Sequence, residues 1–235
     1  MGVMREVSGE YHSKGDYHRE LDRSWRYYPV YEEKMAYVRR YLDAVPHGSS
    51  IVDVGCGEGL LVEEYRAKGY EMQGVDLNYA SEAVRRGDIT ALPVDDASVD
   101  LALCLDVIEH LNFSQQGLAL FELHRVLRSG GKLLLSVPNL AHFASRLSFM
   151  VLGRLIRTSS IERHPGDRPI GEYLKLVRDM GFKISRRDGI FPTYPGVSAL
   201  TAISPRWALP LHRLHNRLAP PPGFCFLNML ELVKS

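Results

Sequence analysis

The sequence predicts an α/β fold built on a doubly wound, mostly parallel sheet, and three observations support this prediction. Short apolar runs alternate with helical segments along most of the chain. The runs are nearly continuous in apolar residues, which is typical of strands buried on both faces. A glycine-rich turn joins the first apolar run to the helix that follows it. Repeated strand–helix units of this kind indicate a parallel sheet covered by helices on both sides.

The length and composition suit one domain with insertions. The chain has 235 residues, of which 45% are hydrophobic and 24% charged. We expect no transmembrane helix, because no apolar run is long enough, and no signal peptide, because the first residues are polar. Three scattered cysteines without a CxxC pair argue against a disulfide framework or a zinc site. These features predict a cytoplasmic protein, with peripheral contact at a membrane surface left open.

The charge is unevenly distributed along the chain. Residues 1–138 contain 15 Lys and Arg against 22 Asp and Glu, whereas residues 139–235 contain 14 against 6. A basic C-terminal third favours an anionic substrate or a nearby anionic surface. The alternative is a solvated basic face, because the sequence does not tell whether these charges cluster in space.

The elements are predicted in the following order. Residues 10–45 are mostly helical and stop at Pro46-His47-Gly48. Strands are predicted at 51–54, 71–75, around Ile89, and at 99–105, 132–137, 182–187 and 224–233. Helices are predicted at 60–68, 81–86, 115–127 and 172–180, the last ending at the capping residue Gly181. Two stretches, 140–168 and 192–223, depart from the alternation and are interpreted as insertions. The second holds seven prolines, so we expect irregular chain around one helix at 207–218.

The strongest motif is the segment 51–61, IVDVGCGEGLL. An apolar strand runs into a turn with three glycines, and a helix follows. Glycines allow a tight turn and a close approach of a ligand to the backbone, and the helix N-terminus offers N–H groups at the positive end of its dipole. Dinucleotide-binding folds use a related turn, so this motif alone does not identify the ligand.

The residues around the turn narrow the choice. Asp53 precedes the first glycine by two residues, and Asp76 ends the second strand, where an acid can accept hydrogen bonds from both hydroxyls of a ribose. Three further blocks follow in order: RGDITALP at 86–93, VDLALCLDVIEHL at 99–111 and LRSGGKLLLSVPN at 127–139.

In this order and spacing, the blocks over 48–139 resemble the class I S-adenosylmethionine (SAM)-dependent methyltransferases, in particular the broad group that includes quinone-biosynthesis enzymes. The resemblance implies a Rossmann-like sheet of seven strands with one antiparallel strand near the C-terminus, and SAM as methyl donor. It divides the single domain 1–235 into an N-terminal helical lid (1–47), a SAM-binding core (48–139) and acceptor-side insertions (140–168 and 192–223).

The resemblance also assigns roles near the methionine and ribose parts of SAM. Asp53 would help to hold the ammonium, and Asp76 would bind the ribose diol. Leu105 would line the methionine end. The backbone that passes under the methionine would be that of Gly55, Cys56, Gly57 and Gly59.

Three more residues would contact the adenine. Leu77 would pack beside the ring, Asp88 would meet its amino group, and Ile89 would donate a backbone N–H. Asp88 has an alternative interpretation, because Asp-Ile-Thr is also compatible with an ordinary turn.

His110 is the candidate catalytic base. It lies after the fourth strand, at the sheet edge where ligands of open α/β folds bind, and an ordinary histidine titrates near about pH 6.5. Methyl transfer from a sulfonium mainly needs alignment, so a base is required only for a protonated acceptor. His110 could instead shape or pack the loop. His164 is a second candidate for substrate contact, with a structural role as the alternative. His212 and His215 supply only two ligands, so we predict no metal.

The insertions are expected to shape the acceptor pocket. Residues 140–157 combine apolar residues with three arginines, which suits a helix on a membrane surface or a helix packed over the active site with its arginines in water. The second insertion suggests a lid over an apolar or mixed acceptor. At the N-terminus, Tyr11, Tyr17 and Tyr27 are candidates for closing over SAM, with ordinary helix packing as the alternative.

The function predicted from the sequence is SAM-dependent methylation of a small-molecule acceptor, directed to an oxygen or a carbon atom. Candidate acceptors are anionic or amphiphilic molecules such as a lipid, quinone or glycan precursor. A SAM-binding module without catalysis is one alternative. A nicotinamide-dependent oxidoreductase is another, disfavoured because the turn is GxGxG rather than GxGxxG. Nucleic-acid methylation is disfavoured because no Asn-Pro-Pro-Tyr-type motif or RNA-binding module is recognisable.

Overall fold

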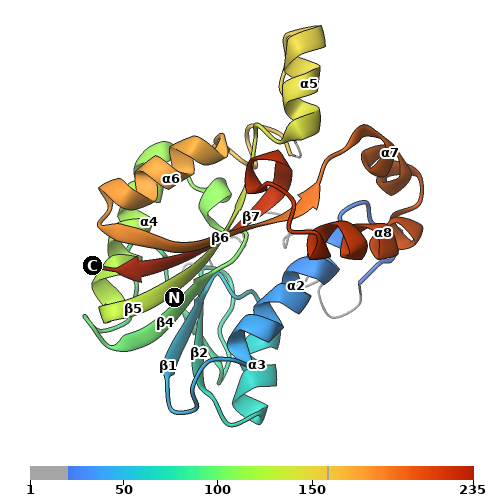
Figure 1. Cartoon of the computed structure of the whole chain (residues 1–235). Coiled ribbons are helices and arrows are strands. Elements are labelled where there is room, and N and C mark those ends of the chain that lie inside the picture. The colour runs from blue at the N-terminus through green and yellow to red at the C-terminus, as the bar shows by residue number, and fades with distance from the viewer. Residues whose placement is uncertain (1–20, 158) are drawn as a thin grey trace, which may run out of the picture.

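The computed structural model describes residues 21–157 and 159–235, and its centre is a seven-stranded sheet in the order β3-β2-β1-β4-β5-β7-β6 (Figure 1). Neighbouring strands from β3 to β5 are parallel, whereas β7 runs antiparallel to both β5 and β6. The predicted fold class, including its single antiparallel strand, is confirmed. The strands are β1 (Ser50–Val54), β2 (Glu71–Asp76), β3 (Val84–Arg86), β4 (Val99–Cys104), β5 (Leu127–Pro138), β6 (Phe182–Pro192) and β7 (Cys225–Lys234).

Helices cover the two faces of this sheet. On one face, α2 (Tyr28–Leu42) and α3 (Leu60–Ala67) pack over strand residues such as Leu101 and Leu103. On the other face lie α4 (Phe113–Val126) and α6 (Ile170–Asp179). Helix α6 ends, as predicted, at a glycine in the left-handed region, Gly181 with φ +88°.

The predicted helix at 81–86 is wrong. Its second half is the short strand β3, in which Val84 pairs with Gly74 and Arg86 with Asp76 of β2. Pairing with β2 satisfies the backbone here, and exposed arginines protect this sheet edge from further pairing. No strand forms at Ile89 either, where the described backbone makes one isolated bridge between Asp88 and Ala91.

The second insertion is more regular than predicted, because it forms two helices. These are α7 (Pro195–Ile203) and α8 (Pro205–Arg217), and a proline stands in the first turn of each. Proline there costs no hydrogen bond and has the φ angle of a helix, so these prolines start helices instead of disrupting them. The hydroxyl of Thr201 on α7 lies 2.8 Å from Nε2 of His212 on α8, and this contact joins the two helices.

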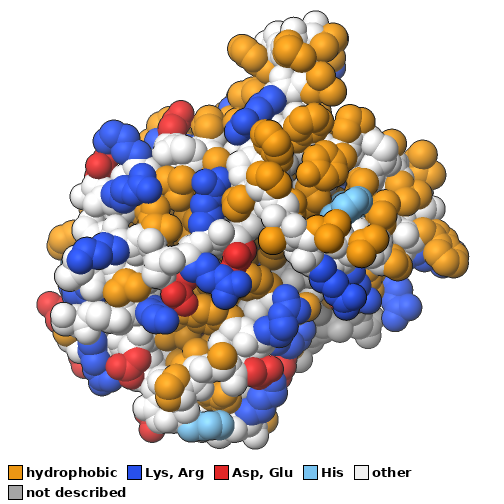
Figure 2. All heavy atoms as spheres, viewed as in Figure 1, with side chains coloured by type: hydrophobic (Ala, Val, Ile, Leu, Met, Phe, Trp, Pro, Cys, Tyr) orange, Lys and Arg blue, Asp and Glu red, His pale blue; other side chains and the backbone are white. Residues whose placement is uncertain are grey.

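The first insertion contains α5 (Phe143–Leu152), which does not pack over the sheet. Figure 1 shows α5 projecting from the body, and Figure 2 shows apolar side chains around it. Of its residues, Ser145 alone is buried. The expectation of a helix packed over the active site is therefore wrong for α5. None of the described helices is long and apolar enough to cross a membrane.

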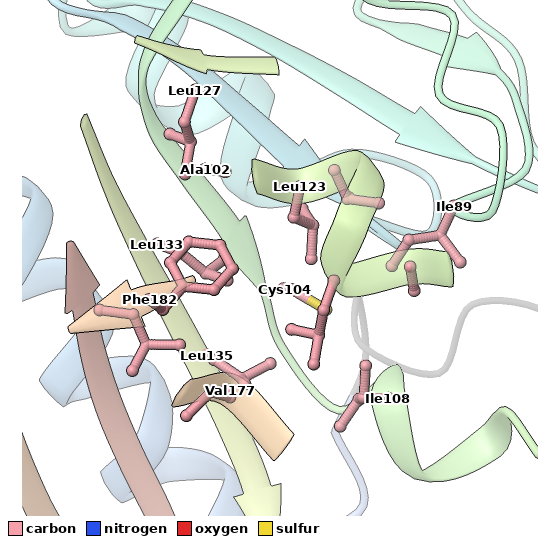
Figure 3. Packing of buried hydrophobic residues seen from close by; sticks show 14 of the residues in the cluster. Ile89, Ala102, Cys104, Ile108, Leu123, Leu127, Leu133, Leu135, Val177 and Phe182 are labelled. Atoms are coloured by element: carbon pink, nitrogen blue, oxygen red, sulfur yellow. The ribbon is translucent and has the colours of Figure 1, made fainter. Parts of the chain in front are cut away.

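The core on the α4 and α6 side extends to the carboxyl ends of the strands. Figure 3 shows Leu123 of α4 and Val177 of α6 pointing towards β4 and β5 residues such as Cys104 and Leu135. Ile108, which follows β4, is fully buried in the same cluster. Because this residue is locked into the core, the loop after β4 has a fixed position.

Candidate functional site

The predicted cofactor residues lie mostly at one edge of the sheet. Strand β1 is parallel to both β2 and β4, so the glycine turn, Asp76 and the loop after Leu105 follow adjacent carboxyl ends. The N–H of Gly55 donates to the carbonyl of Val75 over 2.7 Å, which fixes the turn against β2. Open α/β sheets bind ligands at this edge.

The turn requires glycine at Gly55, Gly57 and Gly59 for reasons of conformation. Their φ angles are +78°, +60° and +88°, in the region that residues with a Cβ rarely adopt. Space is restricted as well, because a Cβ on Gly55 would lie 2.2 Å from Cγ2 of Val107. Helix α3 begins directly after the turn, so its N–H groups and the positive end of its dipole face the same space.

Asp76 is buried and held in one orientation by the backbone. Its Oδ2 accepts a hydrogen bond from the N–H of Gly57 over 2.9 Å, and its Oδ1 accepts one from the N–H of Asn78 over 2.8 Å. Oδ1 also accepts a hydrogen bond from the N–H of Tyr79 over 3.3 Å. The carboxylate thus joins the end of β2 to the glycine turn in a form suited to a ribose.

Asp53 is also buried, but no described residue donates a hydrogen bond to its side chain. Burial raises the pKa of Asp53 to about 7, and the charge of Asp76 adds to this effect while Lys34 opposes it. A buried carboxylate without a donor is costly to ionise. A cationic group bound beside it would offset this cost, and the ammonium of SAM is such a group. The site therefore fits SAM.

The segment expected at the adenine runs beside the end of β2, since the N–H of Gly87 donates to the carbonyl of Asp76 over 2.9 Å. Asp88 is exposed, and its Oδ1 accepts from both the N–H and the hydroxyl of Thr90, each over 2.8 Å. Asp88 therefore caps an ordinary turn formed by Asp-Ile-Thr, which was the alternative to a contact with adenine. Ile89 is buried in the core and Leu77 is exposed, so their roles at the adenine stay predictions.

Sequence reasoning missed an ion pair at the centre of this edge. Lys34 on α2 is buried, and its Nζ contacts the carboxylate of Asp106 directly after β4. The Ser136 hydroxyl donates to the same carboxylate over 2.7 Å. Burial raises the pKa of Asp106, but Lys34 and this hydrogen bond outweigh burial and hold that pKa below its usual range. The sequence did contain a signal for this pair. Lys34 stands four residues from both Val30 and Val38, so it lies on the apolar face of its helix, where a lysine needs a partner.

The structure brings His110 and His164 together. Their ring centroids are 4.6 Å apart in an edge-to-face arrangement. Nδ1 of His110 lies 3.0 Å from the carbonyl oxygen of Arg163, and because a carbonyl only accepts, Nδ1 carries the proton of this bond. In the neutral ring, Nε2 is then the unprotonated nitrogen, so Nε2 is the atom that could accept a proton from an acceptor. Nδ1 of His164 lies 3.4 Å from Oδ1 of Asp167.

Glu109, next to His110 in the chain, is buried. Burial and the nearby charge of Asp106 raise the pKa of Glu109 well above the usual range, which favours its protonated form. Its Oε2 is buried without a hydrogen-bond partner among the described residues. Its carbonyl accepts from the N–H of Gly166 over 3.1 Å, which attaches the first insertion to the loop after β4.

A large open hollow lies elsewhere, at the amino ends of β4 and β5. Asp100 and Lys132, near the beginnings of these strands, contribute to its wall together with Arg128 and Glu231. The glycine turn is at the other ends of the parallel strands, so this hollow is not part of the cofactor site. Among the described residues, no three His, Cys, Asp or Glu side chains group in a way that could hold a metal ion.

Comparison with known proteins agrees with this geometry. Residues 52–135 match the family model of a methyltransferase domain. A probable S-adenosylmethionine-dependent methyltransferase of Mycolicibacterium smegmatis is 31% identical over 154 residues, 61% of this chain and 56% of the relative. Over this part of its length, the chain is similar to SAM-dependent methyltransferases.

Two further matches extend the comparison. A malonyl-[acyl-carrier protein] O-methyltransferase of Erwinia billingiae is 35% identical over 99 residues, 38% of this chain and 39% of that protein. The magnesium protoporphyrin IX methyltransferase of Synechocystis, solved with bound S-adenosylhomocysteine, superposes with a TM-score of 0.56 at 18% identity, covering 87% of this chain and 84% of that one. This structural likeness concerns the fold alone. The chain spans about two fifths to just over half of the two curated relatives' lengths.

Proposed function

We propose that this protein transfers a methyl group from SAM to a small-molecule acceptor, through an oxygen or carbon nucleophile. The observation that carries the proposal is the pair of buried acids at the glycine turn. Asp53 lacks a donor and suits the ammonium, whereas Asp76 is oriented by Gly57 and suits the ribose diol. When bound, SAM supplies a methyl group that its sulfonium already activates for displacement.

The remaining cofactor contacts follow from the same arrangement. Gly55, Cys56, Gly57 and Gly59 pass under the methionine, and Leu105 lines its end of the site. Leu77 and Ile89 flank the adenine, while Asp88 uses the oxygen that does not cap its own turn. We assign Lys34 a supporting role, because its charge keeps Asp106 ionised and lowers the cost of ionising Asp53.

His110 is the proposed base for an acceptor that arrives protonated, such as a phenol or an alcohol. The carbonyl of Arg163 sets its tautomer, and exposure of the ring leaves it accessible to an acceptor. Proton removal of this kind contributes about 10²–10⁴-fold in rate.

Calorimetric titration with SAM, S-adenosylhomocysteine and NAD tests the proposal. We expect both sulfur nucleosides to bind and NAD not to bind. Asp76→Ala should weaken SAM binding by roughly tenfold or more, because a charge-assisted hydrogen bond is lost. Absence of binding by either sulfur nucleoside would refute the proposal. Binding of SAM without turnover across a screen of phenols, alcohols and amphiphiles would favour a regulatory module instead.

A further inference from the structure

The insertion helices carry several large apolar side chains that are exposed among the described residues. Residues Phe149–Leu152 of α5 are 57–76% exposed. Four consecutive helical residues point in four directions, so this end of α5 is apolar all round. A helix of that kind is ordinarily buried, yet nothing in the described chain covers it.

Helix α8 has two apolar faces. Ala208, Leu209 and His212 are buried against the protein. Trp207, Leu214 and Leu218 are 54–71% exposed. These three residues are seven and four positions apart, so they share one direction and form a stripe that faces outwards.

Arginines accompany this stripe. Arg206, Arg213 and Arg217 each precede one of its three apolar residues and form a parallel row. Arg213 pairs with Glu33, with Nε 3.0 Å from Oε1, whereas Arg206 and Arg217 form no ion pair with a described acidic residue. Over the two insertions, 140–168 and 192–223, the sequence contains eight arginines and two acidic residues.

The three helices form one side of the molecule. The ring of Phe143 at the start of α5 lies 5.7 Å from that of Tyr194, which precedes α7, and 5.5 Å from that of Phe224. Figure 1 shows α5 projecting beside α7 and α8, and Figure 2 shows apolar side chains gathered over all three helices. We name this surface the insertion face. Its members are Phe149–Leu152, Arg206, Trp207, Leu214, Arg217 and Leu218.

We propose that the insertion face binds the surface of an anionic lipid bilayer. Its apolar side chains enter the boundary between headgroups and acyl chains, Trp207 lies at the headgroup level, and the arginines bind lipid phosphates. Helix α5 has ten residues and is about 15 Å long, half the thickness of a bilayer core, so it inserts at the surface without crossing.

Charge favours lipid over a second copy of the chain. A two-fold interface through the insertion face would bring the same arginine rows of two copies together, with no acidic residue of 192–223 to neutralise them. Anionic lipid supplies the missing negative charge. The proposal does not depend on the methyl-transfer activity, because its test measures binding to lipid alone.

Sedimentation with vesicles tests the proposal on the full chain. We expect binding to vesicles of equimolar phosphatidylcholine and phosphatidylglycerol, at least tenfold weaker binding to phosphatidylcholine alone, and weakening by salt. The double variant Met150→Asp/Val151→Asp and the single variant Trp207→Asp should each lose tenfold or more. The matched control is Phe121→Asp on α4, where Phe121 is 61% exposed outside the insertion face, and it should bind like the wild type.

Circular dichroism and thermal unfolding establish that each variant is folded, and Arg206→Gln/Arg217→Gln provides a second test without a new negative charge. This variant should lose its preference for phosphatidylglycerol. No binding to either vesicle would overturn the proposal, as would equal losses in Phe121→Asp and the insertion-face variants. Concentration-dependent dimerisation in analytical ultracentrifugation, abolished by Trp207→Asp without vesicle binding by the wild type, would assign the face to a second copy instead.

Discussion

The affinity for SAM should depend on pH through Asp53. Burial raises the pKa of this carboxyl to about 7 in the free protein. If the ionised carboxylate holds the ammonium of SAM, its proton must leave before SAM binds at lower pH. Between pH 8 and pH 5, affinity should therefore fall as the pH decreases.

The size of the effect follows from one linked proton. Below the pKa, each pH unit costs about 1.4 kcal/mol, or tenfold in affinity. The dissociation constant should rise about tenfold from pH 8 to pH 6 and about 100-fold to pH 5. Calorimetry in buffers of different ionisation enthalpy measures both this change and the number of protons released.

Asp53→Asn supplies the decisive comparison. This variant should bind SAM more weakly at pH 8 and show a nearly flat profile, whereas His110→Ala should retain the slope of the wild type. Constant wild-type affinity from pH 5 to pH 8 would refute the assignment of the ammonium to Asp53. A full slope in Asp53→Asn would also refute it.

The same carboxyl affects folding in the opposite sense. Its folded pKa lies above the unfolded value of 3.8, so its contribution to stability is complete below that value and is lost as the pH rises through about 7. Without SAM, Asp53→Asn should therefore be more stable than the wild type at pH 8, by a few kcal/mol at most. Such a gain in stability with a loss of binding is typical of a residue retained for function.

Three further predictions concern other residues of the site. His110→Ala should lower kcat by about 10²-fold with an acceptor that carries a hydroxyl, while SAM affinity in calorimetry stays within about twofold; full activity would exclude His110 as a base. Gly55→Ala should destabilise the fold by about 2 kcal/mol or more in urea unfolding, because φ is +78° and the added Cβ would meet Val107; wild-type stability would contradict this account of the turn. Lys34→Met should lower stability by about 1–2 kcal/mol at pH 7, less than for a fully buried pair because the side chain of Asp106 is 42% exposed; an unchanged urea midpoint would mean that solvent already stabilises Asp106.

The parts of the fold that the sequence predicted are those in which one local pattern decides the structure. Strands such as Val99–Cys104 are short, apolar at every position except Asp100 and largely buried, so composition alone identifies them. The glycine turn was predictable because its conformation excludes residues with a Cβ. Asp53 and Asp76 were placed correctly at the sheet edge because they directly adjoin these patterns.

The errors lie where partners far along the chain decide the structure. Residues Ser81–Arg86 have no strand signal of their own, and β3 exists through pairing with β2. The Lys34–Asp106 pair joins residues 72 positions apart, so no local sequence pattern predicts that the two meet. The prolines of the second insertion were misinterpreted because the same residue disrupts a helix interior and starts a first turn.

The acidic residues of the sheet edge and the arginines of α8 lie on different parts of the fold, and this gives the uneven charge along the sequence a physical interpretation. At the sheet edge, Asp106 is paired with Lys34, whereas Asp53 and Asp76 are acids suited to the ammonium and the ribose of SAM. The arginines of α8, Arg206, Arg213 and Arg217, lie away from this edge on another element, where they suit an anionic acceptor or lipid. Because the two groups occupy different elements, Arg206→Gln/Arg217→Gln should leave SAM affinity unchanged while weakening vesicle binding. A joint loss of both activities would show that the two surfaces are coupled, and would require the insertion helices to contribute to closing the cofactor site.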